Sequence, residues 1–296
     1  MKKKYLSVDV GGTRLKYGLI DENGTLLATG DEATPTNNLD GFLRTLFGIA
    51  RRYQQQASGI AISIPGKVDQ RHSVIYNGGS LPYLDGLPLA HLLKQKFGLP
   101  VTLENDGKCT ALGEYWQGNL RDKPNSGAIV LGTAVGGGLI LDGKIRAGAH
   151  LQSGEVSFMI DPAQTQRIVM GDQCSAVKLI NQLAKHFDLM DINDGKTAFK
   201  YLEERHDLIA NQLLVAYCRR VASMILNIQA ITDLTNFVIG GGISQQPSVV
   251  ATINQEYDYW LEQYPSVRDT VVRPEILAAK LGNSANLLGA LYLLLN

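Results

Sequence analysis

Three glycine-rich turns, each directly after a short apolar segment, constrain this chain more than any other sequence feature. They are Asp-Val-Gly-Gly-Thr at 9–13, Leu-Gly-Thr-Ala-Val-Gly-Gly-Gly at 131–138 and Val-Ile-Gly-Gly-Gly at 238–242. Glycine lets the backbone approach an anion and expose its N–H groups to it. None of the three is a Walker A sequence or a convincing GxGxxG dinucleotide fingerprint. Together they predict a nucleotide held by turns at the ends of several strands.

The first turn carries residue types that suit a phosphate and a metal ion. Alternating apolar residues predict strands over 5–10 and 16–20, so residues 9–13 connect two strands. Thr13 adds a hydroxyl donor, and Asp9 a carboxylate that can hold a hydrated magnesium ion. For this motif standing alone, the alternative is a plain glycine hairpin with an exposed aspartate.

A second candidate is Glu-Asn-Asp-Gly at 104–107, where a predicted strand over 101–104 is followed by a helical run. An acidic residue at the carboxyl end of a strand is well placed to face a ligand. Asn105 and Asp106 are also good helix-capping residues, so a purely structural cap is the competing interpretation.

The two halves of the chain repeat the same order of elements around their glycine turns. Periodicity predicts further strands over 25–28, 59–64, 128–131, 136–141 and 237–239, and helices over 39–53, 89–97, 176–187, 208–231 and 286–295. Two related α/β halves follow from this order. No Pro- or Ser-rich linker separates them, so we expect the boundary near 115–125 to be a hinge.

Composition restricts the possible partners. Lys+Arg and Asp+Glu both number 28, so the net charge is zero and no global field attracts a nucleic acid or an anionic membrane. The apolar stretches are shorter than the ~20 residues of a membrane span. The three cysteines fit neither a disulfide framework nor a CxxC zinc site. We therefore expect a cytoplasmic protein that binds no nucleic acid and no membrane.

The motifs resemble those of the ROK family of sugar kinases and repressors, in the family's order and over essentially the whole chain. They are DVGGTRLKYGLID at 9–21, ENDGKCTALGE at 104–114, LGTAVGGGL at 131–139, SGE at 153–155, VIGGG at 238–242 and GNSANLLGA at 282–290. The resemblance implies an α/β, two-lobed hexokinase/actin-like ATPase fold with duplicated ribonuclease H-like domains. Residues 1–117 and 284–296 would form the small N-terminal lobe, and residues 118–283 the large C-terminal lobe.

The resemblance also implies an activity and a role for each motif residue. A homodimeric kinase would use ATP and magnesium to phosphorylate the 6-hydroxyl of a glucose-type sugar, with Asp106 as the catalytic base. Because phosphoryl transfer has a loose transition state, one carboxylate that orients the hydroxyl and accepts its proton late is sufficient. The sugar-binding residues would be Gly66, Asn105, Asp106 and Glu155. The ATP-binding residues would be Asp9, which also holds magnesium through water, with Gly11, Gly12, Thr13, Lys16, Gly132, Thr133, Gly136, Gly137, Gly240, Gly241 and Gly242.

The chain departs from the family at its zinc site. Most members have a His three residues after the glutamate and a cysteine-rich loop, whereas this chain has Phe158 and, over 160–174, only Cys174. We therefore predict no zinc, and we expect Phe158 and Met159 to hold the substrate-binding loop by packing.

An apolar residue in place of that His favours a substituted anomeric oxygen over a free one. The expected substrate is thus a β-glucoside such as cellobiose, as for the zinc-less bacterial β-glucoside kinases, with glucokinase and N-acetylmannosamine kinase as alternatives. In the competing picture, Phe158 fills the space left by the zinc site and closes the pocket.

Two other classes of protein remain. A repressor of this family would need a DNA-binding segment before the first phosphate motif, and we expect none, because only eight residues precede Asp9. A sugar-sensing or actin-like ATPase without phosphotransfer would not need the base Asp106. Hexose-dependent turnover of ATP separates the kinase from the sensor.

Overall fold

The computed structural model describes residues 2–160 and 169–296, which form two compact units. Unit 1 contains the chain up to Asp122, together with Ile145–Ser153 and Asn283–Asn296. Unit 2 contains Lys123–Lys144 and Gly154–Gly282. The chain therefore leaves and re-enters unit 1 twice, and its last helix belongs to the same unit as its first strand.

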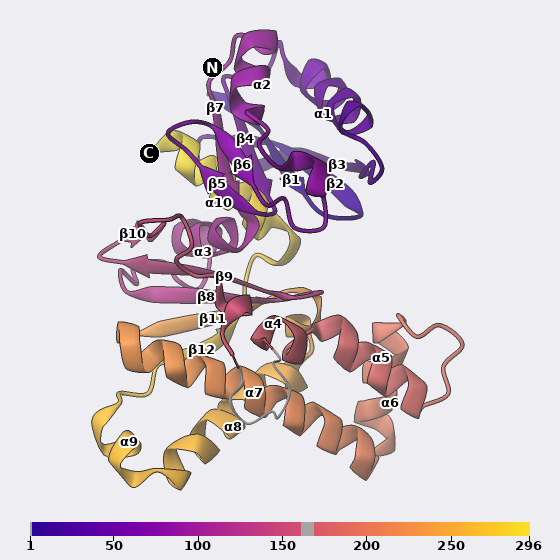
Figure 1. Ribbon diagram of the computed structural model, residues 1–296, viewed down its shortest axis with the longest axis vertical. Coiled ribbons are helices and arrows are strands. Elements are labelled where there is room, and N and C mark those ends of the chain that lie inside the picture. Colours follow the sequence, from indigo (N-terminus) through magenta and orange to yellow (C-terminus); the bar gives the residue numbers. More distant parts are fainter. Residues whose placement is uncertain (1, 161–168) are drawn as a thin grey trace. The chain divides into compact units, whose positions relative to one another are not determined.

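Unit 1 is built on a five-stranded sheet with the order β3-β2-β1-β4-β7 (Figure 1). The first three strands form an antiparallel meander, and the other two run parallel to β1. Their bounds are β1 Lys4–Val10, β2 Arg14–Asp21, β3 Leu26–Ala33, β4 Ile60–Ile64 and β7 Val101–Asn105. A small hairpin, β5 (Lys67–Asp69) and β6 (Val74–Tyr76), follows β4. The helices of unit 1 are α1 Leu39–Tyr53, α2 Leu89–Phe97, α3 Asp106–Gln117 and α10 Ala285–Leu295, with the 3-10 turns η1 Pro82–Leu84 and η4 Gly282–Ser284.

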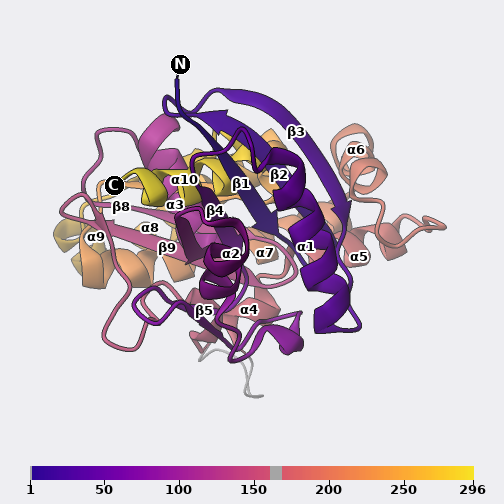
Figure 2. The ribbon, with the colours of Figure 1, turned by 90° about the horizontal axis from the view of Figure 1, so that it is seen from above.

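The two faces of this sheet have different partners, because successive side chains of a strand point to opposite sides. Leu6 and Val8 of β1 pack in a core with apolar residues of α1 and α2. Ser7, between them, donates to the carbonyl oxygen of Leu287 in α10 at 2.7 Å. Helix α3 lies beside α10 in both ribbon views (Figures 1 and 2). The odd-numbered positions of β1, which include Asp9, therefore face the layer of α3 and α10.

Unit 2 repeats this plan with a sheet of order β10-β9-β8-β11-β12. Strands β8 and β9 are antiparallel, and β11 and β12 continue the sheet parallel to β8. The strands are β8 Ser126–Leu131, β9 Val135–Leu141, β10 Lys144–Ile145, β11 Asn236–Gly240 and β12 Glu275–Ala278. The helices are α4 Met170–Gln173, α5 Ala176–His186, α6 Gly195–Arg205, α7 Leu208–Thr232, α8 Pro247–Gln263 and α9 Pro265–Thr270, with the 3-10 turns η2 Val156–Phe158 and η3 Gly242–Gln245. The shared strand order confirms the predicted duplicated α/β halves.

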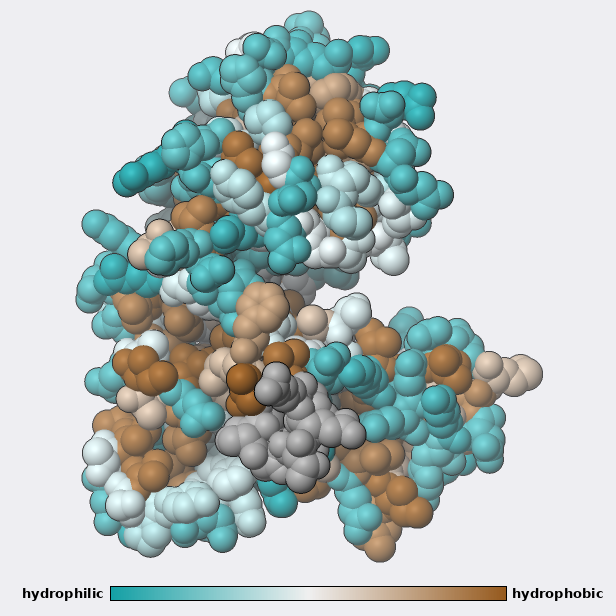
Figure 3. Space-filling model, viewed as in Figure 1, coloured by the Kyte–Doolittle hydropathy of each residue, from teal (hydrophilic) through white to brown (hydrophobic). Residues whose placement is uncertain are grey.

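The surface carries no sign of a membrane span in the described residues. Hydrophilic residues cover much of the face in Figure 3, and hydrophobic residues lie among them in smaller groups, which is ordinary for a globular protein. None of the described helices combines the length and the apolar character needed to cross a bilayer.

Candidate active site

The turn between β1 and β2 is shaped by its two glycines. A side chain on Gly12 would place its Cβ 2.7 Å from Oγ of Ser80, closer than a side chain tolerates without movement. Thr34 fixes the turn from β3's end, since its hydroxyl donates to the Gly11 carbonyl at 2.7 Å and its backbone N–H to the Thr13 carbonyl at 2.9 Å. The Thr13 side chain is exposed. Its hydroxyl can therefore reach a ligand from a fixed backbone.

Asp9 lies at the end of β1 and pairs across the ladder with Lys16. Its Oδ1 accepts hydrogen bonds from Ser63 Oγ at 2.7 Å and from Asn286 Nδ2 at 2.9 Å. Burial raises the pKa of Asp9, and the two hydrogen bonds and the charge of Lys16 only partly oppose this. A desolvated carboxylate gains from a neighbouring cation, and hard cations prefer oxygen ligands. Asp9 therefore fits the single carboxylate that a largely hydrated magnesium ion takes from a protein.

Asp106 is the first residue of α3, and the side chain of Asn105 caps this helix. Asn105 Oδ1 accepts from the Lys108 N–H at 3.2 Å, and its Nδ2 donates to the Gly66 carbonyl and to Asp106 Oδ1, both at 3.0 Å. The Gly107 N–H also donates to Asp106 Oδ1, at 2.8 Å. The cap is thus Asn105 and not Asp106. The half-buried Asp106 carboxylate is held at a helix N-terminus, an environment that favours a negative charge.

Gly66 follows β4 in a conformation that requires glycine. Its φ of 97° lies in the left-handed region, and a Cβ there would lie 2.4 Å from the carbonyl oxygen of Asn77. The glycine therefore lets the chain turn beneath Asn105, whose amide binds the Gly66 carbonyl. In unit 1 the structure brings together the predicted sugar residues Gly66, Asn105 and Asp106.

Glu104, a buried residue, binds the backbone of Asn105. The sequence alone did not indicate this role. Glu104 is 2% exposed, and it accepts the Asn105 backbone N–H at 2.8 Å and the Gln70 side-chain amide at 2.5 Å. Burial raises the pKa of Glu104, opposed by the charge of the nearby buried Lys108 and by these hydrogen bonds. Lys108 in turn donates to the carbonyl of Leu151 at 3.2 Å. A buried polar network thus underlies the strand end that carries the candidate base.

In unit 2, the turn between β8 and β9 contains Gly132 and Thr133. The Gly132 N–H donates to the Ala134 carbonyl at 3.0 Å, and the Gly132 carbonyl accepts from the Ala176 N–H, at the start of α5, at 2.8 Å. Thr133 is exposed, like Thr13 in the corresponding turn of unit 1. Both units therefore present a threonine from a fixed turn after their first strand.

Gly137, in the glycine run 136–138, has a packing role that the sequence did not reveal. A Cβ on Gly137 would lie 2.5 Å from the carbonyl oxygen of Gly154, and a Cβ on Gly154 would lie 2.9 Å from that of Gly137. Gly136 pairs with Val130 in the β8–β9 ladder. The close approach of the two backbones holds the start of the segment that carries Glu155 against β9.

The third glycine cluster lies at the end of β11. Gly240 pairs with Val130 in the neighbouring parallel strand β8, so both glycine turns of unit 2 occupy the carboxyl edge of its sheet. Gly241 has a φ of 93°, and a Cβ there would lie 2.0 Å from the Leu131 carbonyl oxygen. A Cβ on Gly242 would meet nothing within 4 Å. Ligands of α/β sheets bind at this edge.

The segment after Glu155 differs in part from expectation. Ser157 Oγ accepts from the Val135 N–H at 3.0 Å and donates to its carbonyl at 2.7 Å, and Met159 packs against the core as expected. The prediction that Phe158 helps to hold this loop by packing is wrong, because its side chain is 65% exposed. The three-residue turn η2 and the hydrogen bonds of Ser157 to Val135 hold the backbone, and the Phe158 ring lies outside the core.

Part of this loop, residues 161–168, lies outside the described residues. Within the described ranges, no three His, Cys, Asp or Glu side chains form a group that could hold a metal ion. Cys109, Cys174 and Cys218 are buried and are not in disulfides.

Sequence reasoning missed Ser63, Glu104, Thr110 and Asn286 in unit 1. Ser63 and Asn286 bind the Asp9 carboxylate, and Thr110 donates to Asn286 Oδ1 at 2.6 Å. The sequence held a partial signal, since Asn286 belongs to the closing GNSANLLGA motif and Thr110 to ENDGKCTALGE. Their partners, however, are far away along the chain.

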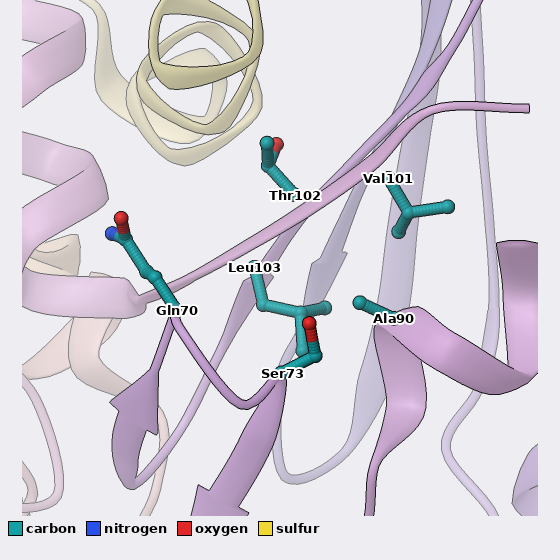
Figure 4. A pocket seen from close by; sticks show the side chains of 6 residues that line it. All are labelled: Gln70, Ser73, Ala90, Val101, Thr102 and Leu103. Carbon is teal, nitrogen blue, oxygen red and sulfur yellow. The ribbon is translucent and has the colours of Figure 1, made fainter.

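A cavity of about 150 Å³ lies beside β7. It is lined by Gln70, Ser73, Ala90, Val101, Thr102 and Leu103. In Figure 4 the side chains of Ser73, Ala90 and Leu103 converge, whereas Thr102 points to the other side of the strand. None of the predicted site residues lines this cavity.

Comparison with known proteins matches nearly the whole chain to one family. The family model described as "ROK family" matches residues 5–296. A β-glucoside kinase of Klebsiella pneumoniae is 28% identical over 298 residues, which cover 98% of this chain and 95% of that protein.

Solved structures agree with this match. A ROK family protein from Streptococcus pneumoniae TIGR4, in complex with sucrose, has a TM-score of 0.86 at 28% identity, covering 99% of this chain and 98% of that one. A putative N-acetylmannosamine kinase from Listeria monocytogenes has a TM-score of 0.85 at 27% identity, with coverage of 99% and 98%. These likenesses confirm the predicted hexokinase/actin-like ATPase fold.

Proposed function

The chain belongs to the ROK family, and we propose that this sugar kinase transfers the γ-phosphate of ATP to the 6-hydroxyl of a glucose-type sugar, preferentially a β-glucoside such as cellobiose. The observation that carries the proposal is the geometry of Asp106 at the start of α3. Asn105 caps the helix through the Lys108 N–H, and Asp106 Oδ1 accepts from Asn105 Nδ2 and from the Gly107 N–H, which orient the carboxylate. The cap is thus supplied by Asn105, and the oriented carboxylate of Asp106 is assigned to the base.

In this proposal Asp106 accepts the proton of the sugar 6-hydroxyl. A bond forms between that oxygen and the γ-phosphorus, while the bond from phosphorus to the β–γ bridging oxygen breaks and its electron pair leaves with ADP. Asn105 and Gly66 bind the sugar, which accepts the phosphoryl group, next to the base, since the Asn105 amide already links the Gly66 carbonyl to Asp106. Accurate placement of a single base is the main protein contribution that such a transfer needs.

The phosphates are assigned to the first glycine turn of each unit, with Gly11, Gly12, Thr13 and Lys16 in unit 1 and Gly132, Thr133, Gly136 and Gly137 in unit 2. The third cluster, Gly240, Gly241 and Gly242, is assigned to the adenosine part of ATP. Asp9 would hold magnesium, through water. A bound magnesium ion offsets the negative charge of the phosphates. We keep residues 1–117 with 284–296 as the acceptor lobe and 118–283 as the nucleotide lobe.

The preference for a β-glucoside is supported by Phe158. Its ring is 65% exposed and offers an apolar face to a second sugar ring. Glu155, three residues earlier, is the proposed sugar contact of the same segment. A β-glucoside kinase is also among the relatives. N-acetylmannosamine is the second candidate, because a putative kinase of that sugar has nearly the same fold.

A coupled ADP-release assay with cellobiose, glucose and N-acetylmannosamine tests the substrate. Burial of part of a second ring contributes on the order of 1 to 3 kcal/mol, so kcat/KM for cellobiose should exceed that for glucose by about tenfold to a hundredfold. Phe158→Ala should lower kcat/KM for cellobiose but not for glucose. Ile231→Ala, at another exposed apolar side chain, is the control. A clear preference for either monosaccharide would reject the β-glucoside assignment and leave the sugar kinase in place.

A further inference from the structure

The closing motif of the chain, which the proposed function leaves without a role, supplies side chains to the candidate site of unit 1. We infer that Asn286 is a positioning residue that fixes the Asp9 carboxylate and, through Thr110, couples it to the helix that begins with the base Asp106. The inference rests on the proposed function, because it assigns Asp9 to the phosphate side and Asp106 to the sugar side.

Two hydrogen bonds of Asn286 join Asp9 to Thr110 of α3. Asn286 Nδ2 donates to Asp9 Oδ1 at 2.9 Å, and Asn286 Oδ1 accepts from the Thr110 hydroxyl at 2.6 Å. The Thr110 oxygen also lies 3.2 Å from the Asp106 carbonyl oxygen, one turn earlier in α3. Each end of the amide is matched to its partner, since a carboxylate only accepts and the hydroxyl donates. A flipped amide would place Asn286 Oδ1 against the Asp9 carboxylate, and both of these groups only accept hydrogen bonds.

The packing of α3 against α10 makes this chain of bonds rigid. A Cβ on Gly113 of α3 would lie 2.2 Å from the Ala285 carbonyl oxygen, and a Cβ on Gly289 of α10 would lie 1.8 Å from the Cys109 carbonyl oxygen. The two helices therefore touch through their backbones on either side of the contact between Thr110 and Asn286. Figure 2 shows them side by side. Neither helix can shift without moving the amide.

A second asparagine of the closing motif, Asn283, binds Lys16 of the first phosphate motif. Asn283 Oδ1 accepts from Lys16 Nζ at 2.7 Å. Lys16 is the ladder partner of Asp9, so the segment 283–286 binds both Asp9 and Lys16 of the first phosphate motif. Asn286 contacts Asp9 and not the reacting atoms, and its role is therefore to position another side chain.

The test compares Asn286→Ala, Thr110→Val and Thr110→Ser. A hydrogen bond to a charged group is worth about tenfold to a hundredfold in an equilibrium or a rate. Asn286→Ala should lower kcat by about that factor and leave the KM for the sugar within about twofold. It should also raise, by about tenfold, the Mg²⁺ concentration at which a non-hydrolysable ATP analogue half-maximally raises the melting temperature of the protein.

Thr110→Val should lower kcat by about tenfold, since it frees the amide, whereas Thr110→Ser keeps the hydroxyl and should restore kcat. The double variant Asn286→Ala with Thr110→Val should be no worse than Asn286→Ala alone, because both changes break one chain. Asn211→Ala, at an exposed helical asparagine of α7, is the control.

Two results would overturn the inference. One is an unchanged kcat and Mg²⁺ requirement in Asn286→Ala. The other is a parallel loss of kcat and melting temperature in Thr110→Val and Thr110→Ser alike, which is the mark of a purely structural contact. If the wild-type protein phosphorylates no sugar, the proposed function fails, but the Mg²⁺ titration with the analogue still decides the role of Asn286.

Discussion

At the scale of single residues, the neighbours of Asp106 allow its proposed role as a base to be tested apart from that of a helix cap. Asp106→Asn keeps the shape of the side chain and the cap by Asn105, but it removes the acceptor of the proton. We expect kcat to fall by roughly 10² to 10⁴ while KM changes little. Asp40→Asn, at the exposed aspartate in the first turn of α1, is a matched control and should retain kcat. Steady-state kinetics of the two variants check this, and near-normal turnover of Asp106→Asn would make Asp106 a structural residue.

Glu104 gives the site a predictable dependence on pH. Burial raises the pKa of its carboxyl above the usual 4.5. A carboxyl with a raised folded-state pKa favours the fold at low pH, and this contribution is lost as the pH rises through that pKa. The wild-type protein should therefore lose unfolding free energy relative to Glu104→Gln as the pH is raised from about 4.5 to about 7.

Urea unfolding of both proteins across this range measures the difference. Glu22→Gln, in an exposed turn, serves as the control for a lost surface carboxylate. A difference between wild type and Glu104→Gln that stays constant with pH would show that the buried carboxyl carries no desolvation cost.

The residues of the site were predictable only where the local sequence carried the signal. Asp9 and Asp106 stand at the ends of apolar strands next to glycines, an arrangement that points to a ligand. Asn286 and Thr110 are ordinary helix residues, and their hydrogen bonds span 277 and 176 positions of the chain. No periodicity or spacing predicts such a contact. Phe158 was predicted to pack, but its side chain is exposed, and no local pattern of the sequence indicated this.

At the scale of elements, the contact between α3 and α10 depends on glycines that have no conformational need to be glycine. In Gly289→Ala the new Cβ would lie 1.8 Å from the Cys109 carbonyl oxygen, so the helices must separate. We expect a loss of about 1 to 3 kcal/mol in unfolding free energy. Gly48→Ala is the matched change in α1, where a Cβ meets nothing within 4 Å, and it should gain about 0.5 to 1 kcal/mol. Urea unfolding measures both, and equal effects would contradict the packing argument.

Long amphipathic helices were the most predictable elements. The bounds of α1 and α2 agree with the predicted 39–53 and 89–97, because their apolar stripes end at clear breaks. The hairpin of β5 and β6 was missed, since three-residue strands are too short to show alternation. Strand β12, with four residues, was also too short. Helix α6 was missed because most of its residues are polar or charged.

At the scale of the whole molecule, duplication explains why related turns recur in both units. Each unit places a glycine turn and an exposed threonine after the first strand of its sheet. Only unit 1 adds the Asn105–Asp106 pair, because its fifth strand, β7, ends in polar residues where β12 ends in Ala278. The proposed kinase thus combines two similar phosphate-binding turns with one acceptor site.

The most direct measurement follows ATP consumption and sugar phosphorylation together in the purified protein with magnesium and cellobiose. Phosphorus NMR of the product and coupled ADP detection give both quantities in one reaction. We predict one ADP released for each sugar 6-phosphate formed, no turnover without sugar, and loss of both signals in Asp106→Asn. Release of inorganic phosphate from ATP at the same rate with and without sugar would contradict this prediction.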